Sequence, residues 1–144
     1  MSTTPFFSIV TASYNSEKTI SDTIDSVLNL DFQDFEYIII DGNSSDSTLE
    51  IIKSFVPKFE AKGVSYRFIS EKDKGIYDAW NKGIQLSSGK WISFLGSDDS
   101  YLLNALQLYF IEIEKNKTIN YISSQVNLTN EKGKVLSVFG KKYD

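Results

Sequence analysis

The stretch "FEYIIIDGNSSDST", residues 35–48, joins an apolar run to a polar turn and the start of a helix. Three consecutive isoleucines are typical of a strand that is covered on both faces, as in parallel sheets flanked by helices. Ser47 and Glu50 have the spacing of a capping box, which predicts a helix beginning there. We therefore expect a strand over residues 35–41, followed by a helix that ends at Pro57.

The same alternation continues on both sides of this stretch. Apolar runs predict further strands at 6–12, 64–70 and 90–96, and apolar residues at helical spacing predict helices after them. A fifth strand is expected over "INYISSQV" (119–126), and "TNEKGK" (129–134) is typical of a hairpin turn before a strand at 135–140. The pattern predicts an α/β fold in which a Rossmann-like, mostly parallel sheet carries helices on both faces. We expect one domain over residues 1–144.

Composition limits the chemistry that this chain can use. Its 144 residues carry a net charge of −4 with scattered basic residues, so a nucleic-acid partner is not expected. The chain has no cysteine and no histidine, so catalysis would depend on carboxylates, hydroxyls, lysine or a hard metal ion. Neither a signal peptide nor an apolar run of the roughly 20 residues that cross a membrane is recognisable.

A polar cluster follows each of the first four expected strands, and ligands of such sheets bind beyond the carboxyl ends of the strands. The adjacent carboxylates Asp98 and Asp99 are hard oxygen ligands suited to Mg²⁺ or Mn²⁺. Asp41 could accept hydrogen bonds from a nucleobase or a ribose, and Tyr14 could flank a base. Gly42 would let the backbone approach a ligand closely. The sequence thus predicts a ligand site at this edge of the sheet.

Simpler structural roles fit the same residues taken singly. Asp99 could cap a helix starting near Leu102, and Asp41 could belong to an ordinary turn. Tyr14 and Asn15 could serve packing and helix capping, Asp73 and Lys74 could form a solvated loop, and Tyr77 and Trp80 suit the core better than a ligand platform. Convergence of four loops on one edge favours a site. Because phosphate-loop and dinucleotide-binding glycine motifs are absent from the sequence, those classes fit poorly.

Two long stretches resemble the inverting glycosyltransferases of family 2, which have the GT-A fold. They are "SIVTASYNSEKTISDTIDSVLNLDFQDFEYIIIDGNSSDST" and "EKDKGIYDAWNKGIQLSSGKWISFLGSDDSY", and the resemblance covers roughly residues 6 to 115. It implies a nucleotide-diphosphate sugar donor, most often a UDP-sugar. It also implies transfer with inversion to the hydroxyl of a glycan or lipid-linked acceptor, in polysaccharide or glycan biosynthesis. The implied location is the cytoplasm, at the inner face of the membrane.

The resemblance also assigns site residues. It implies that Ala12, Ser13 and Tyr14 lie against the base, and that Asp41 contacts the nucleoside. Asp73 would line the nucleoside pocket, while Asp98 and Asp99 would reach the ribose and the metal-bound diphosphate. The metal would be Mg²⁺ or Mn²⁺. No separate roles follow for the other members of the matched block, Tyr77, Asp78, Asn81 and Lys82.

Two departures from the family pattern bear on these assignments. The acidic motif is often D-x-D-D, and here Gly96 stands at its first position, which makes Asp98 the better metal-ligand candidate and Asp99 the second. The catalytic base of the family lies in the acceptor-binding half, and "KGKVLSVFGKKYD" (132–144) has no match to it. We therefore expect the donor half of a truncated hexosyltransferase-type enzyme, inactive alone, with its base beyond Asp144.

Two other classes stay open as alternatives. A nucleotidyltransferase can share this sheet and its metal requirement, although "TASYNSEK" (11–18) lacks the glycines of a triphosphate loop. A nucleotide-binding or interaction module without catalytic activity is the second alternative.

Overall fold

The computed structural model describes residues 3–140. The chain divides into two compact units, Met1–Gln107 and Leu108–Asp144, and helix α5 (Ala105–Lys115) runs across the division. Within the described residues, no helix is long and apolar enough to cross a membrane.

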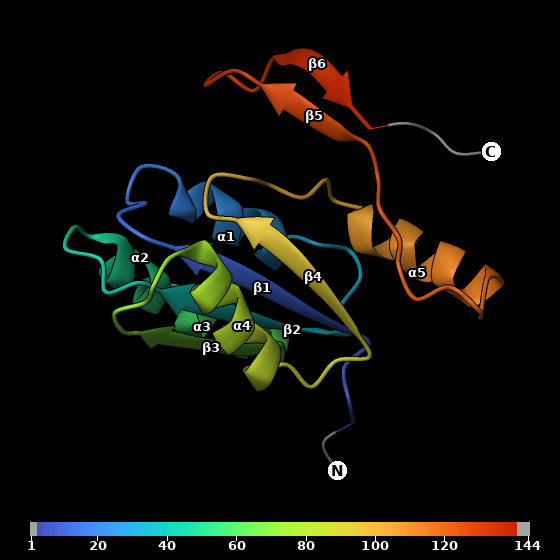
Figure 1. Cartoon of the computed structure of the whole chain (residues 1–144), viewed down its shortest axis with the longest axis horizontal. Coiled ribbons are helices and arrows are strands. Elements are labelled where there is room, and N and C mark those ends of the chain that lie inside the picture. The colour runs from blue at the N-terminus through green and yellow to red at the C-terminus, as the bar shows by residue number, and fades with distance from the viewer. Residues whose placement is uncertain (1–2, 141–144) are drawn as a thin grey trace. The chain divides into compact units, whose positions relative to one another are not determined.

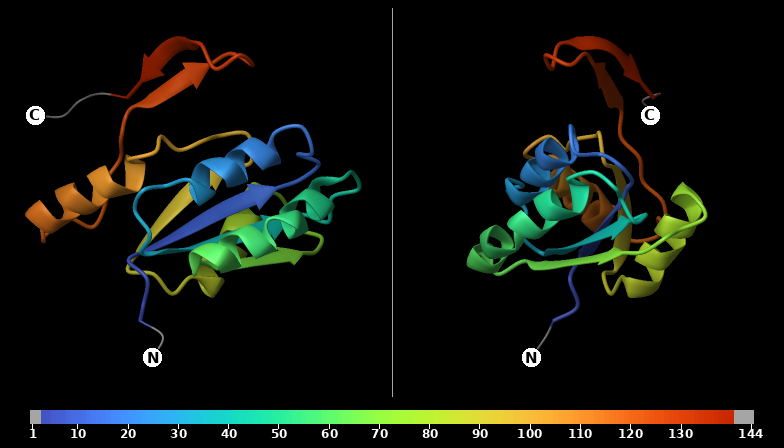
Figure 2. Two further views of the ribbon diagram at one scale, coloured as in Figure 1. Left: turned by 180° about the vertical axis from the view of Figure 1, so that it is seen from behind. Right: turned by 90° about the vertical axis from the view of Figure 1, so that its left-hand side faces the viewer.

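The elements of the first unit are, in chain order, β1 (Phe7–Ser13), α1 (Ile20–Leu28), β2 (Phe35–Asp41), α2 (Thr48–Ser54), α3 (Val56–Lys62), β3 (Ser65–Ser70), α4 (Ile76–Leu86) and β4 (Trp91–Gly96). The four strands form a parallel sheet in the order β3-β2-β1-β4 (Figure 1). Helices α1, α2 and α3 lie on one face of this sheet and α4 on the other (Figure 2, right). The predicted α/β class, with a parallel sheet between helices, is confirmed.

Strand β2 lies inside the sheet, and all seven of its residues are buried. Ile38 and Ile40 pack with Ala79 of α4, on one face. Successive side chains of a strand point to opposite faces, so Tyr37 and Ile39 lie on the other. There the ring of Tyr37 lies 5.8 Å from that of Phe59 in α3. The three isoleucines are therefore covered on both faces, as the sequence predicted.

The helical segment after β2 differs from the prediction in two ways. Ser47 makes no side-chain capping hydrogen bond, so the predicted capping box is wrong. Asp46 takes that role, because its Oδ1 accepts the Thr48 N–H at 3.0 Å. Pro57 does not end the helical segment but stands in the first turn of a second helix, α3, where a missing N–H costs nothing.

The predicted fifth strand is also misplaced. Residues 119–125 form no strand, and β5 (Val126–Thr129) begins where Val126 pairs with Phe139 of β6 (Val135–Phe139). The two strands form an antiparallel hairpin in the second unit, and the predicted turn at 129–134 is confirmed. Among the residues that the structure describes, no strand pairs with 119–125, and Tyr121 is exposed. Pairing therefore starts only where a second strand is available.

Candidate functional site

Hydrogen bonds join the loop after β1 to the loop after β2. The Asn15 N–H donates to Ser44 Oγ at 2.9 Å, and the Ser45 N–H donates to Asn15 Oδ1 at 2.9 Å. Further along, the Ser47 N–H donates to Glu17 Oε2 at 3.0 Å. Asn15 thus holds the neighbouring loop and does not cap α1, which begins at Ile20. The two loops are fixed before any ligand binds.

Asp41 is fully buried at the carboxyl end of β2. Its Oδ1 accepts from Ser13 Oγ at 3.2 Å, and its Oδ2 accepts from Ser70 Oγ at 2.7 Å and from the Ser44 N–H at 3.0 Å. Ser44 Oγ donates to Oδ1 as well. A buried carboxylate with these donors is more than an ordinary turn residue, because it joins the ends of three neighbouring strands. Ser44 and Ser70 were not among the predicted site residues, although both are polar residues at or just beyond strand ends.

We expect Asp41→Asn to destabilise the protein by about 1–2 kcal/mol, since the amide cannot accept all the donors that the carboxylate accepts. Thermal unfolding of the variant checks this, with Asp34→Asn, outside the network, as the control. Equal unfolding temperatures for the two variants would show that the network contributes nothing to stability.

Tyr14, Gly42 and Asp73 come from three different loops and meet at one point. A Cβ atom placed on Gly42 would lie 2.8 Å from Asp73 Oδ2 and 3.3 Å from Tyr14 Cδ2. Tyr14 is 64% exposed, so it does not serve core packing. Asp73 is half-buried and accepts the Gly75 N–H at 3.0 Å, so it is not a freely solvated side chain. This cluster combines an open aromatic face with a carboxylate.

The acidic pair lies at the end of β4, whose Gly96 pairs with Ala12 of β1. The Asp99 N–H donates to the Gly96 carbonyl at 3.1 Å, which closes a tight turn. A Cβ on Gly96 would lie 2.7 Å from Asp99 Oδ2 and 3.1 Å from Asp98 Oδ1, so the carboxylates gather above the glycine. Both side chains are exposed. Asp99 does not cap a helix near Leu102, because α5 starts at Ala105.

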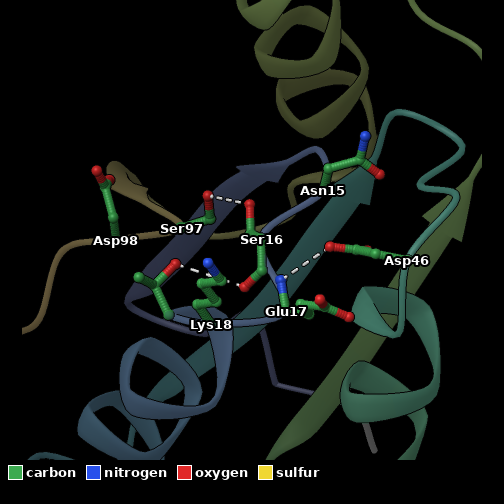
Figure 3. A pocket seen from close by; sticks show the side chains of 8 residues that line it. Asn15, Ser16, Glu17, Lys18, Asp46, Ser97 and Asp98 are labelled. Atoms are coloured by element: carbon green, nitrogen blue, oxygen red, sulfur yellow. Dashed lines mark hydrogen bonds between the residues drawn. The ribbon is translucent and has the colours of Figure 1, made fainter.

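An open hollow of about 450 Å³ adjoins Asp98 (Figure 3). Ser16 Oγ and Ser97 Oγ are 2.9 Å apart in a hydrogen bond that joins the β1 loop to the β4 loop. Among the described residues, no three His, Cys, Asp or Glu side chains gather as a metal cluster. Two carboxylates open to solvent still suit Mg²⁺ or Mn²⁺, since these ions take further oxygens from phosphates and water. The hollow is lined by Asn15, Ser16, Glu17, Lys18, Thr19, Asp46, Ser97 and Asp98.

Helix α4 begins directly after the loop that carries Asp73. Tyr77 is 76% exposed, so its expected place in the core is wrong, whereas Trp80 is half-buried and packs 4.9 Å from Phe94. Lys82 forms ion pairs with Glu71 at 3.0 Å and with Asp78 at 3.6 Å. The spacing of Asp78 and Lys82, four residues apart on a helix, is a recognisable signal of such a pair.

Comparison with known proteins shows to which sequences and structures this chain is similar. The family model "Glycosyl transferase family 2" matches residues 8–137. A PGL/p-HBAD biosynthesis glycosyltransferase of Mycobacterium tuberculosis is 38% identical over 96 residues, which cover 67% of this chain and 36% of that protein. The chain thus spans about a third of this relative.

Solved structures share the fold. The structure of S. aureus TarS 1–349 in complex with UDP-GlcNAc matches with a TM-score of 0.70 and 25% identity, over 77% of this chain and 32% of that one. A mannosyltransferase from Pyrobaculum calidifontis, solved with GDP-Man and Mn²⁺, matches with a TM-score of 0.65 and 17% identity, over 71% and 30% of the two chains. The second match concerns the fold alone.

Proposed function

This chain belongs to glycosyl transferase family 2, and we propose that it forms the donor-binding part of an enzyme that uses a nucleotide-diphosphate sugar, with a UDP-sugar as the donor. The single observation that carries the proposal is the meeting of Tyr14, Gly42 and Asp73 at the sheet edge where Asp98 and Asp99 also lie. The TarS complex with UDP-GlcNAc supports the choice of donor, because it is similar in sequence as well as in fold.

The proposed nucleoside pocket lies between the loops after β1, β2 and β3. The exposed face of Tyr14 offers a surface on which a base can stack. Asp73 and Asp41 offer carboxylate oxygens to N–H and O–H groups of the nucleoside, with Ala12 and Ser13 forming the floor. Asp41 can exchange a hydroxyl partner for a nucleoside donor only if Ser13, Ser44 or Ser70 rotates away.

Asp98 and Asp99 would hold the divalent metal, together with oxygens of the donor diphosphate. When bound, the metal neutralises negative charge that develops on the leaving diphosphate. The missing side chain at Gly96 leaves room for both carboxylates over the end of β4.

The proposed reaction is a displacement with inversion. The acceptor hydroxyl forms a bond to the anomeric carbon, the bond from that carbon to the diphosphate oxygen breaks, and the hydroxyl proton passes to a general base. The acceptor would be a glycan or a lipid-linked glycan, in polysaccharide biosynthesis. We expect little or no turnover by this chain alone. Three further points stay predictions. They are a single nucleotide-sugar-binding domain over residues 1–144, a hexosyl donor, and a location in the cytoplasm at the inner face of the membrane.

Calorimetric titration with UDP, with and without Mn²⁺, tests the donor site. We expect Mn²⁺ to tighten UDP binding about tenfold, which corresponds to about 1.4 kcal/mol. The double variant Asp98→Asn/Asp99→Asn should lose this gain. The control Glu112→Gln/Glu114→Gln changes the net charge equally on the exposed side of α5 and should keep it.

Three results would contradict parts of the proposal. Equal Mn²⁺ dependence in both double variants would overturn the metal assignment. If UDP binds neither with nor without Mn²⁺, the interaction module without catalytic activity would be favoured. Tighter binding of a nucleoside triphosphate than of UDP, with release of pyrophosphate, would favour the nucleotidyltransferase.

A further inference from the structure

We propose that Lys82 and Asp78 of α4 are positioning residues for nucleotide binding. Their side chains hold the loop at residues 71–75 so that Asp73 lies against Gly42 and Tyr14. This inference rests on the proposed donor site and adds a device that supports it. Neither residue is expected to contact the nucleotide itself.

Lys82 holds the first part of the loop from the helix. Its Nζ lies 3.0 Å from Glu71 Oε1 and donates to the carbonyl of Lys72 at 3.3 Å. The Lys82 side chain is only 24% exposed, so its ammonium group donates hydrogen bonds to the loop in place of water. A hydrogen bond from Lys82 to Glu71 raises the pKa of Lys82 from its ordinary value, so the group stays charged at neutral pH.

Asp78 holds the last part of the same loop. Its Oδ2 accepts the N–H of Lys74 at 3.0 Å and lies 3.6 Å from Lys82 Nζ. The hydrogen bond from the Lys74 N–H lowers the pKa of Asp78 below its ordinary value. The backbone on each side of Asp73 is therefore bonded to a side chain of α4.

The geometry of Asp73 depends on these two bonds. Its Oδ1 accepts the Gly75 N–H within the loop, while its Oδ2 is the atom that faces Gly42. The beginning of the loop is bonded to the sheet, where the Glu71 N–H donates to the Asp41 carbonyl at 3.0 Å. At its other end the Gly75 carbonyl accepts the N–H groups of Asp78 and Ala79, at 3.0 and 3.1 Å. Without the side chains of Lys82 and Asp78, the residues between these two ends would lose their bonds to α4, and Asp73 could move away from Tyr14.

Helix α4 is a rigid base for this function. Gly83, next to Lys82, is so close to β1 that a Cβ on it would lie 2.3 Å from Val10 Cγ1. Because the helix backbone lies directly on the sheet, the positions of Asp78 and Lys82 are fixed relative to β1 and β2. The loop therefore keeps a defined position relative to the strands that precede the other proposed nucleotide-binding residues.

A competing explanation is that Lys82 attracts the diphosphate by charge alone. Removal of Asp78 separates the two explanations, because Asp78→Ala takes away a negative charge. Electrostatic attraction then predicts tighter UDP binding, whereas a positioning role predicts weaker binding. Lys82→Arg is the conservative variant, since a guanidinium can also donate to Glu71 and to the Lys72 carbonyl.

The experiment is a set of UDP titrations in Mn²⁺ on the full chain, combined with amide hydrogen exchange of Lys74. We expect Lys82→Met and Asp78→Ala each to weaken UDP binding about tenfold. We expect Lys82→Arg to stay within about twofold of the unaltered protein. Exchange at the Lys74 N–H should accelerate in Asp78→Ala before UDP is added. The control Lys115→Met breaks an equivalent exposed ion pair with Glu112 and should leave both readouts unchanged.

Two outcomes would overturn the inference in different ways. If the unaltered protein binds UDP and Asp78→Ala binds it equally well or more tightly, the positioning role is wrong and the donor site stands. If the unaltered protein does not bind UDP at all, the proposed function fails and the inference fails with it.

Discussion

Replacement of Glu36 by alanine is expected to destabilise the fold by about 3 kcal/mol, the largest loss that we predict for a single side chain. Glu36 is 3% exposed and lies near the start of β2, at the other end of the strand from Asp41. Its Oε1 accepts from Ser8 Oγ at 2.6 Å and from the Ser88 N–H at 2.6 Å, and its Oε2 pairs with Arg67 at 2.7 Å. The side chain thus joins β1, β3 and the segment between α4 and β4.

The loss comes mainly from the buried donors. Arg67 is 46% exposed, so water replaces much of its ion pair. The fully buried Ser8 hydroxyl would instead lose its acceptor, and a buried group left unpaired costs about 1–3 kcal/mol. The Ser88 N–H, whose bond to Glu36 is only partly buried, adds less. Thermal or denaturant unfolding measures the change. Glu60→Ala, on the exposed side of α3, is the control and should change stability by less than about 0.5 kcal/mol.

The contribution of Glu36 also predicts a pH dependence. Burial by itself raises the pKa of Glu36, but the hydrogen bonds from Ser8, Ser88 and Arg67 outweigh it and lower the pKa below the ordinary 4.5. A depressed pKa in the folded state adds stability above the unfolded pKa, and this stability is lost as the pH falls through the folded value. The stability difference between the unaltered protein and Glu36→Gln should therefore be constant near pH 7 and shrink below about pH 4.5. A difference that grows on acidification would contradict the assignment.

Gly83→Ala is the second large effect, and here two contributions have opposite signs. Alanine in the middle of a helix is favoured over glycine by about 1 kcal/mol. A Cβ at this position would lie 2.3 Å from Val10 Cγ1, and the crowded atom belongs to a stiff, β-branched side chain in the buried strand β1. Overpacking costs about 1–3 kcal/mol, and a 2.3 Å contact belongs at the upper end of that range. Less the gain of about 1 kcal/mol from helix propensity, we expect a net loss of about 2 kcal/mol.

A double-mutant cycle with Val10→Ala identifies the cause. If the clash explains the loss, the double variant should be more stable than the sum of the single effects by at least about 1 kcal/mol. Urea unfolding of the four proteins provides the measurement. A Gly83→Ala protein more stable than the unaltered one would show that α4 does not lie so close to β1.

Much of the fold follows from local patterns. The run of isoleucines in β2 and the polar residues after it give both the burial of the strand and its end at Asp41. Two predictions were wrong: the capping residue of α2 and the start of the fifth strand. Asp46 is the capping group because its Oδ1 accepts the first N–H of α2, that of Thr48, whereas Ser47 makes no side-chain capping hydrogen bond. The strand predicted over 119–126 begins only at Val126 because pairing depends on where β6 lies.

The sequence by itself determined that carboxylates and polar loops follow buried parallel strands. The burial of a strand and the place where it ends depend on residues that are close together in the sequence. It could not determine which of these loops touch. That was decided by the strand order β3-β2-β1-β4, which sets Asp41 between Ser13 and Ser70 and places Asp73 and Tyr14 on either side of Gly42. Strand order arises from the joint packing of all helices and strands, so the site is a property of the tertiary structure, even though its residues can be named in advance.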